Sequence, residues 1–213
     1  MKTENKHTLT ATRGVCYKIL SESFSSPEGL ELRNIKILYD EMEKVDREAA
    51  LAVEKMKESY QATGSRSELM VDHARLFIGP FSLLSPPFGS FYLDQEKRVM
   101  GDSTLSVNDL YMKFGLTVAS DFHSTPDHIS AELEFMYYLT AKELDAVEAK
   151  DKESSARILE SQKLFLNRYL APWIPEFTLD LEQNAQTPFY RNFGVALRRF
   201  VEREHRYLSG DIP

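Results

Sequence analysis

Residues 126–144 read PDHISAELEFMYYLTAKEL and are the most informative segment of the chain. Its apolar residues recur every three or four positions, which indicates a helix with Thr125 as N-cap and Pro126 at the first helical position. On a helical wheel they form two adjacent stripes over more than half of the circumference, so we expect this helix to be buried on two sides. The stripes are Ile129, Leu133, Met136, Thr140 and Leu144, and beside them His128, Glu132, Phe135 and Leu139.

The rest of the chain shows the same helical spacing, without the period-two pattern of strands. Further helices are predicted around Val15–Leu20 with Phe24 as an extension, and over Asp40–Tyr60, Ser65–Phe77, Ser106–Phe114, Ser154–Leu170 and Phe189–Tyr207. The boundary signals are a capping box at Ser65 and Glu68, Gly115 after a helix end, and Thr187–Pro188 before a helix start. A short extended piece is expected at Ser90–Leu93.

These patterns predict an all-α protein. We expect one compact helical bundle of about eight to ten helices, spanning residues 1–213. Potential subdomains 1–123 and 124–213 would join near Pro126–Asp127–His128.

The composition is that of a globular protein with a sizeable core, since 42% of its 213 residues are hydrophobic and 28% are charged. The single cysteine, Cys16, cannot form an internal disulfide, and a reducing compartment such as the cytoplasm is expected. The net charge of −7 argues against a nucleic-acid partner. Asp102 to Glu160 holds twelve acidic and five basic residues, so this region carries the negative excess and would attract a cationic partner.

One uncharged window, Leu76–Leu93, has nearly the length of a membrane span. Its glycines and prolines rule out a continuous helix, so we expect a buried or groove-lining loop and no stable membrane insertion. The N-terminus has no apolar run behind its lysines, so we do not expect it to be a secretory signal.

No catalytic constellation stands out, and neither a cofactor nor a metal is expected. Phosphate-binding and nucleophile-elbow motifs are missing from the sequence. A di-iron bundle would need two Glu-x-x-His pairs in its core, and the two pairs present, Glu4–His7 and Glu202–His205, lie at the chain ends. Asp72 and His73 are adjacent and make poor joint ligands, and Cys16 fits a core position better than a nucleophile.

The start of the 126–144 helix admits two interpretations. In the structural one, the helix dipole favours Asp127 at the second helical position, and His128 and Glu132 pair locally. In the functional one, these groups line a groove and hold the cations of a partner. On the wheel, Asp127 and Glu134 fall on the side opposite to the apolar stripes.

Several ordered motifs resemble those of the TorD/DmsD family of redox-enzyme maturation chaperones. The sequence of the Leu76–Leu93 loop is most similar to that of the DmsD-like branch of this family. The motifs are ARLFIGP at 74–80, SPPFGSFYLD at 85–94, GDSTL at 101–105, PDHI at 126–129, PWIPEF at 172–177 and PFY at 188–190. The similarity extends from about Leu69 to Phe200.

The resemblance implies the all-α fold of these chaperones and a non-enzymatic function. A chaperone of this kind binds the twin-arginine signal peptide of a molybdenum-cofactor oxidoreductase, and often its catalytic subunit, in the cytoplasm. It delays export until the cofactor has been inserted. The chain is expected to be a monomer or a domain-swapped dimer with its hinge near Pro126.

The resemblance also implies a peptide-binding site. Asp127 and His128 match the Asp-His signature of the family, and Asp127, with Glu132 or Asp102, would bind guanidinium groups. The remaining expected groove residues are His73, Leu76, Phe77, Phe88 and Tyr92. Two alternatives remain: a generic helical adaptor, and a small helical hydrolase or metal-dependent oxidase. Replacing Asp127 and His128 would leave an adaptor intact and weaken a signal-peptide chaperone.

Overall fold

The computed structural model describes residues 2–24, 27, 30–62, 66–79 and 83–212, with side chains from residue 6 onward. Its helices are α1 (Lys2–Ser23), α2 (Leu32–Val45), α3 (Arg47–Ala62), α4 (Arg66–His73), α5 (Gly89–Leu93), α6 (Asp102–Lys113), α7 (Ile129–Glu148), α8 (Lys152–Phe165), α9 (Ile174–Asn184) and α10 (Pro188–Ser209). Two π-helical turns, η1 (Ala74–Ile78) and η2 (Leu166–Leu170), continue α4 and α8. The predicted all-α class is confirmed: within the described ranges, the β-structure is limited to an isolated bridge.

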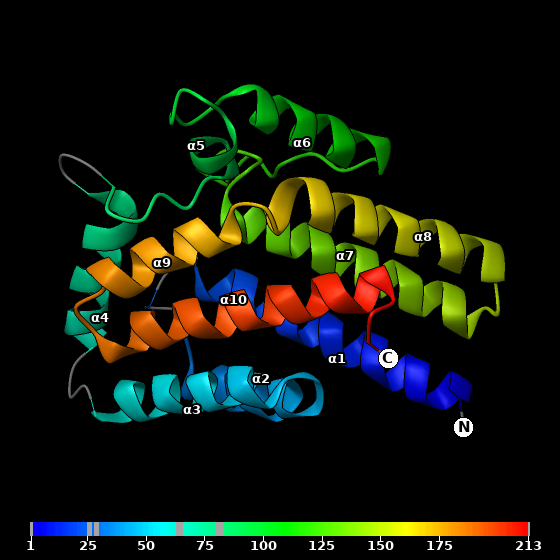
Figure 1. Cartoon of the computed structure of the whole chain (residues 1–213), viewed down its shortest axis with the longest axis horizontal. Helices are drawn as coiled ribbons and strands as arrows, with labels where there is room; N and C mark the ends of the chain where they lie inside the picture. The colour runs from blue at the N-terminus through cyan, green and yellow to red at the C-terminus, as the bar shows by residue number, and fades with distance from the viewer. Residues whose placement is uncertain (1, 25–26, 28–29, 63–65, 80–82, 213) are drawn as a thin grey trace.

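The helices form a layered bundle (Figure 1). α1 packs against α2 and α7, α7 packs against α8, and α10 packs against α3 and α9. In Figure 1, α2 and α3 lie on one side of the bundle and α5 and α6 on the other, with α1 and α7–α10 between them. None of the described helices is long and apolar enough to cross a membrane.

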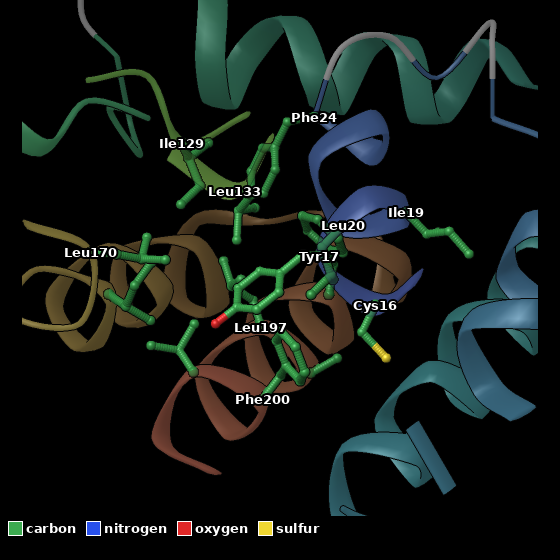
Figure 2. Close-up of a cluster of buried hydrophobic side chains, with 14 of the residues drawn as sticks. Cys16, Tyr17, Ile19, Leu20, Phe24, Ile129, Leu133, Leu170, Leu197 and Phe200 are labelled. Carbon is green, nitrogen blue, oxygen red and sulfur yellow. The ribbon is translucent and has the colours of Figure 1, made fainter. Parts of the chain in front are cut away.

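The core lies where α1, α7 and α10 meet. Figure 2 shows Tyr17 and Leu20 of α1 close to Leu197 and Phe200 of α10, and the rings of Tyr17 and Phe200 pack edge to face at 4.8 Å. Both predicted stripes of α7 contribute to the buried interior, which confirms a helix covered on two sides; their buried residues are Ile129, Glu132, Leu133, Phe135, Met136, Leu139 and Thr140. Cys16 is fully buried, as expected of a core residue.

Two local boundary signals are confirmed. Thr187 caps α10, because its side-chain oxygen accepts a hydrogen bond from the backbone N–H of Tyr190, and Pro188 opens the helix. Gly115 follows α6 with a φ of 70°. The N–H groups of Gly115 and Leu116 then bond to the carbonyls of Met112 and Tyr111, as in a Schellman motif.

The prediction of a single helix over Asp40–Tyr60 is wrong, because the helix is interrupted at Asp46. This residue is extended, with a φ of −150° and a ψ of 110°. Its carboxylate accepts a hydrogen bond from the N–H of Ala49 at 2.8 Å. Asp46 therefore caps α3, and α2 and α3 fold back on each other as separate helices.

Other predicted boundaries need correction as well. Ser90–Leu93 is not extended but belongs to the short helix α5. α6 begins at Asp102, one turn before the predicted start at Ser106. The capping box predicted at Ser65 lies outside the described residues.

The start of α7 differs from the prediction in a way that matters for the site. The helix begins at Ile129, and its N-cap is His128 rather than Thr125. Pro126 and Asp127 form a turn before the helix, closed by a bond from the His128 N–H to the Thr125 carbonyl. Asp127 is therefore not at the second helical position, and it is buried rather than turned away from the core.

A buried polar network that the sequence analysis did not predict holds four helices of the bundle together. Arg13 of α1 is fully buried and donates to Glu204 of α10 at 2.8 and 3.0 Å and to Glu143 of α7 at 3.3 Å. Its remaining nitrogen donates to Gln162 of α8 at 2.6 Å, and its guanidinium lies 4.5 Å from the Tyr207 ring centre. One side chain thus connects four helices.

A second buried carboxylate organises the start of α10. Asp72 of α4 accepts hydrogen bonds from the backbone N–H groups of Gln186 and Thr187 and from the Thr187 hydroxyl. Arg75 also donates to it at 2.9 Å. Burial alone would raise the pKa of Asp72, but the bonds from Thr187, Gln186 and Arg75 hold that pKa below its usual value.

Candidate functional site

The predicted Asp-His signature lies in a short backbone pairing that we call the seam, formed by residues 87–90 and 127–129. The Ile129 N–H donates to the Pro87 carbonyl, and the Gly89 N–H donates to the Asp127 carbonyl, both at 2.9 Å. Phe88 and His128 face each other in the isolated antiparallel bridge. The seam therefore joins the start of α5 to the start of α7.

Asp127 holds the seam with its side chain. It is fully buried, and its Oδ2 accepts a hydrogen bond from the Ser90 N–H at 2.8 Å. Its Oδ1 is buried without a hydrogen-bond partner. In this conformation the carboxylate bonds to the backbone of α5 and does not face solvent. It is therefore not positioned to bind an incoming guanidinium group.

Glu132 is the second buried carboxyl group beside the seam. Its Oε2 accepts a hydrogen bond from the indole N–H of Trp173 at 3.1 Å, whereas Oε1 has no partner. Burial raises the pKa of Glu132 well above its usual value, and the nearby charge of Asp127 acts in the same direction. Gly89 lies so close that a Cβ atom there would be 3.1 Å from Oε1. The sequence analysis noted Trp173 only as part of the PWIPEF motif and did not identify it as the hydrogen-bond partner of Glu132.

His128 caps α7 through Nδ1, which lies 3.2 Å from the Ser130 N–H and 2.7 Å from its hydroxyl. It is half-buried, and Phe88 and Phe122 pack edge-on against its ring, with centroids at 5.3 and 5.9 Å. Burial lowers the pKa of His128 to about 4, even though the Asp127 charge opposes the shift. The imidazole is therefore neutral at pH 7 and acts as a cap rather than as a cation.

This neutral histidine predicts an acid sensitivity. Because the pKa of His128 is about 4 in the fold and about 6.5 in an unfolded chain, the unfolded state binds more protons between these values. Its contribution to stability is complete above pH 6.5 and decreases as the pH falls toward 4, by up to about 1.4 kcal/mol per pH unit. His128→Asn keeps a capping oxygen, so urea unfolding between pH 7 and 4.5 should show a smaller loss for this variant. Equal losses would contradict the prediction, and His123→Asn, at an exposed position, is the control.

The structure brings Phe88 and Tyr92 to the same region as Asp127, Glu132 and His128. Tyr92 is half-buried and stacks on Trp173 at 5.5 Å, and its hydroxyl donates to Asp180 at 3.1 Å. Burial raises the pKa of this phenol, so it stays protonated. Through these contacts the Tyr92 ring packs beside the seam, next to Trp173.

The other predicted groove residues lie elsewhere. Leu76 and Phe77 are buried in the core, where Phe77 packs against Phe24 and Tyr190, so neither side chain lines an open surface. His73 is also buried, and its Nε2 lies 3.3 Å from the Phe24 carbonyl oxygen. Burial lowers the pKa of His73. Asp102 is exposed at the start of α6.

An open apolar hollow of about 420 Å³ lies next to the seam. Buried Tyr111 and Phe135 form its aromatic base, and Phe122, which packs on His128, forms part of its wall. Its remaining lining comes from the 116–121 loop and α7: Leu116, Thr117, Val118, Ala119, Asp121, Ala131, Glu134 and Tyr138. Asp121 and Glu134 are the two charged residues of the lining, and both are exposed.

The helical wheel found one of these two carboxylates without assigning it a function. It placed Glu134 away from the buried stripes, and that position is confirmed. On α7, Ala131, Glu134, Phe135 and Tyr138 share one face, because they are spaced three and four residues apart. Asp121 belongs to an irregular loop whose path no sequence pattern indicates.

The arrangement is suited to binding. Within the described part of the chain, no group of three or more His, Cys, Asp or Glu side chains could hold a metal ion. What the seam and the hollow offer together is an apolar surface, aromatic rings and free carboxylates. Such a surface complements a ligand that combines apolar side chains with positive charge.

The fold is that of a redox-enzyme maturation protein. A crystal structure of a putative redox enzyme maturation protein from Archaeoglobus fulgidus matches this chain with a TM-score of 0.51 at 23% identity, and the match covers 90% of this chain and 93% of the other. Residues 42–179 match the family described as nitrate reductase delta subunit. The chain belongs to this family, which is also that of the TorD and DmsD chaperones.

Curated relatives agree with this assignment. The chain is 23% identical to the chaperone protein TorD of Aliivibrio salmonicida, over 92% of this chain and 89% of the relative. It is 32% identical to the Tat proofreading chaperone DmsD of Salmonella typhi, over 64% of this chain and 60% of the relative. A selenate reductase assembly chaperone of Thauera selenatis is 36% identical over 48% of this chain and 51% of its own length. These relatives are chaperones, and this chain is a chaperone of their family and not an enzyme.

Proposed function

We propose that this protein is a cytoplasmic, system-specific chaperone that binds the twin-arginine signal peptide of a molybdenum-cofactor oxidoreductase subunit. It would hold that subunit back from export until the cofactor is inserted. The relatives support the proposal, since one is named a Tat proofreading chaperone and another an assembly chaperone of selenate reductase.

The observation that carries the proposal is the position of the Asp127–His128 signature. It lies in a seam whose His128 packs on Phe122, and Phe122 lines the apolar hollow. A twin-arginine leader presents two guanidinium groups followed by an apolar stretch. The apolar stretch fits a hollow lined by aromatic and aliphatic side chains, and guanidinium groups prefer carboxylates.

Calorimetric titration with leaders from candidate molybdoenzymes tests the proposal. We expect micromolar or tighter binding to the cognate leader, and binding about tenfold weaker after both arginines are replaced by lysine, because an ammonium cannot make bidentate contacts. Binding should also weaken with salt. A generic adaptor would show no preference between the two leaders, and that outcome would contradict the proposal.

Asp127→Ala tests the function of the seam. The substitution removes the acceptor of the Ser90 N–H and should weaken leader binding by disturbing the wall beside the hollow. Because Asp127 is buried, we expect it to act as a positioning residue and to weaken binding of the arginine and lysine leaders by the same factor. A loss confined to the arginine leader would instead indicate direct contact.

A further inference from the structure

We propose that Asp121 and Glu134, at the apolar hollow, are the carboxylates that bind the arginine pair of the leader. The inference rests on the proposed function and replaces the expected ligands Asp127, Glu132 and Asp102. Nothing in the wheel pattern or the family motifs assigns this role to either residue.

Availability is the first argument. Asp121 and Glu134 are exposed, and among the described residues neither has an ion-pair or hydrogen-bond partner. Asp127 is fully buried and already bonds to Ser90, and Glu132 is fully buried and bonds to Trp173. Burial also raises the pKa of Glu132, which favours the neutral carboxyl group and disfavours an ion pair.

Aromatic and aliphatic side chains surround the two carboxylates. Phe122 lines the same hollow, is half-buried and follows Asp121 in the chain, so it offers an aromatic ring next to an acidic group. The Tyr138 ring also lines the hollow, and the Lys142 ammonium lies 5.8 Å from its centre, so this ring already receives a cation. A guanidinium group can bond to a carboxylate while its plane packs on an aromatic ring. An apolar side chain following the arginines would pack on Leu116, Val118 and Ala131 in the hollow.

Charge complementarity is the third argument, and it selects the occupant. No basic residue lines the hollow, and the 102–160 region that contains it carries the negative excess of the chain. An anionic or purely apolar segment would leave both carboxylates without a counter-charge. The occupant that fits is an extended or helical segment with adjacent arginines and apolar residues.

The test uses the double variant Asp121→Asn/Glu134→Gln in the full chain, titrated with the twin-arginine leader and its twin-lysine control. We expect the variant to bind the arginine leader about tenfold or more weakly and to lose the preference for arginine over lysine. The matched control is Asp109→Asn/Glu160→Gln, which removes two exposed carboxylates from outside the hollow that have no hydrogen-bond or ion-pair partner among the described residues. It should bind as the unmodified protein does.

The outcomes separate the site from the function. If the unmodified protein binds the leader and the double variant binds it equally well, the assignment of Asp121 and Glu134 is overturned and the proposed function stands. Equal losses in both double variants would also overturn the assignment, because bulk charge would then explain the effect. Absence of leader binding by the unmodified protein would overturn both. Ala131→Trp, which fills the hollow, should weaken both leaders, and unchanged binding would count against the hollow.

Discussion

Arg13→Ala is expected to lower the free energy of unfolding by about 3–5 kcal/mol, the range found when one partner of a buried ion pair is removed. The reason is the state of the two carboxylates left behind. Glu143 and Glu204 are both fully buried, and without Arg13 their negative charges would lose the main cation that faces them. Arg13 itself stays charged: burial opposes this, but Glu204 and Glu143 hold the pKa of its guanidinium above the usual value.

Urea unfolding at pH 7 measures this effect. Arg198→Ala is the matched control, because Arg198 forms an ion pair with Glu182 at 2.6 Å, and the two side chains are about a quarter exposed (27% and 26%). Such a pair contributes about 1 kcal/mol or less. A loss below about 1.5 kcal/mol for Arg13→Ala would contradict the argument.

A triple variant separates the cost of an orphaned charge from the value of the network. Replacing Arg13, Glu143 and Glu204 together by Met, Leu and Leu removes all three charges and keeps most of the packed volume. Apolar replacement of a whole buried ionic network is often neutral or stabilising. We therefore expect the triple variant to be more stable than Arg13→Ala.

The second large effect is expected for Asp72→Ala, with a loss of about 2–4 kcal/mol. The substitution leaves the N–H groups of Gln186 and Thr187 and the Thr187 hydroxyl without their acceptor at the start of α10. α10 contributes Leu197 and Phe200 to the core, so a poorly anchored start weakens the packing of the whole helix. Asp109→Ala, at an exposed position, should change stability by about 0.5 kcal/mol or less.

The loss at Asp72 should depend on pH in one direction. The pKa of Asp72 is held below its usual value in the fold, whereas an unfolded aspartate titrates near 3.9. The stabilisation is therefore present above about pH 4 and is lost as the pH falls through the lower, folded value. Unfolding measured at pH 7 and at pH 3 should show a smaller difference between Asp72→Ala and the unmodified protein at pH 3. A difference that grows in acid would contradict this assignment.

The sequence predicted the fold wherever the signal is local. Thr187–Pro188 and Gly115 have side-chain or backbone chemistry that selects a helix end without help from the rest of the chain. The same reasoning was wrong at Thr125–Pro126. There the N–H of Ile129 donates to the Pro87 carbonyl, and with this contact to a distant segment the N-cap is His128 and the helix begins at Ile129.

The burial of Arg13, Glu143 and Asp72 was missed because a charged residue is expected at the surface. The positions themselves carried a signal. Glu143 lies four residues after Leu139 and continues a predicted apolar stripe of α7, and Asp72 lies between Leu69 and Leu76 on the apolar face of α4. A carboxylate on an apolar stripe indicates a buried partner elsewhere in the chain. Which partner it meets, Arg13 or Thr187, depends on helix packing that a single sequence does not encode locally.

The candidate site was predicted in part for the same reason. The ordered motifs predicted that the site lies around Asp127 and His128. The helical wheel was drawn with Asp127 as a helical residue, so it placed this side chain at the surface, whereas Asp127 precedes the helix and is buried. The hollow depends on how the 116–121 loop lies over α7, a path set by tertiary contacts such as Phe122 against His128.

The hydrogen bond from the Ser90 N–H to Asp127 joins two residues that are 37 positions apart. It closes the intervening stretch, which contains α6 and one wall of the hollow, into a loop whose two ends meet at buried positions. The entropic cost of closing such a loop rises only logarithmically with its length. Residues can therefore be added to or removed from this loop at a small cost in folding free energy. Length variation between α5 and α7 can therefore reshape one wall of the hollow while the helices that fold the protein keep their sequence.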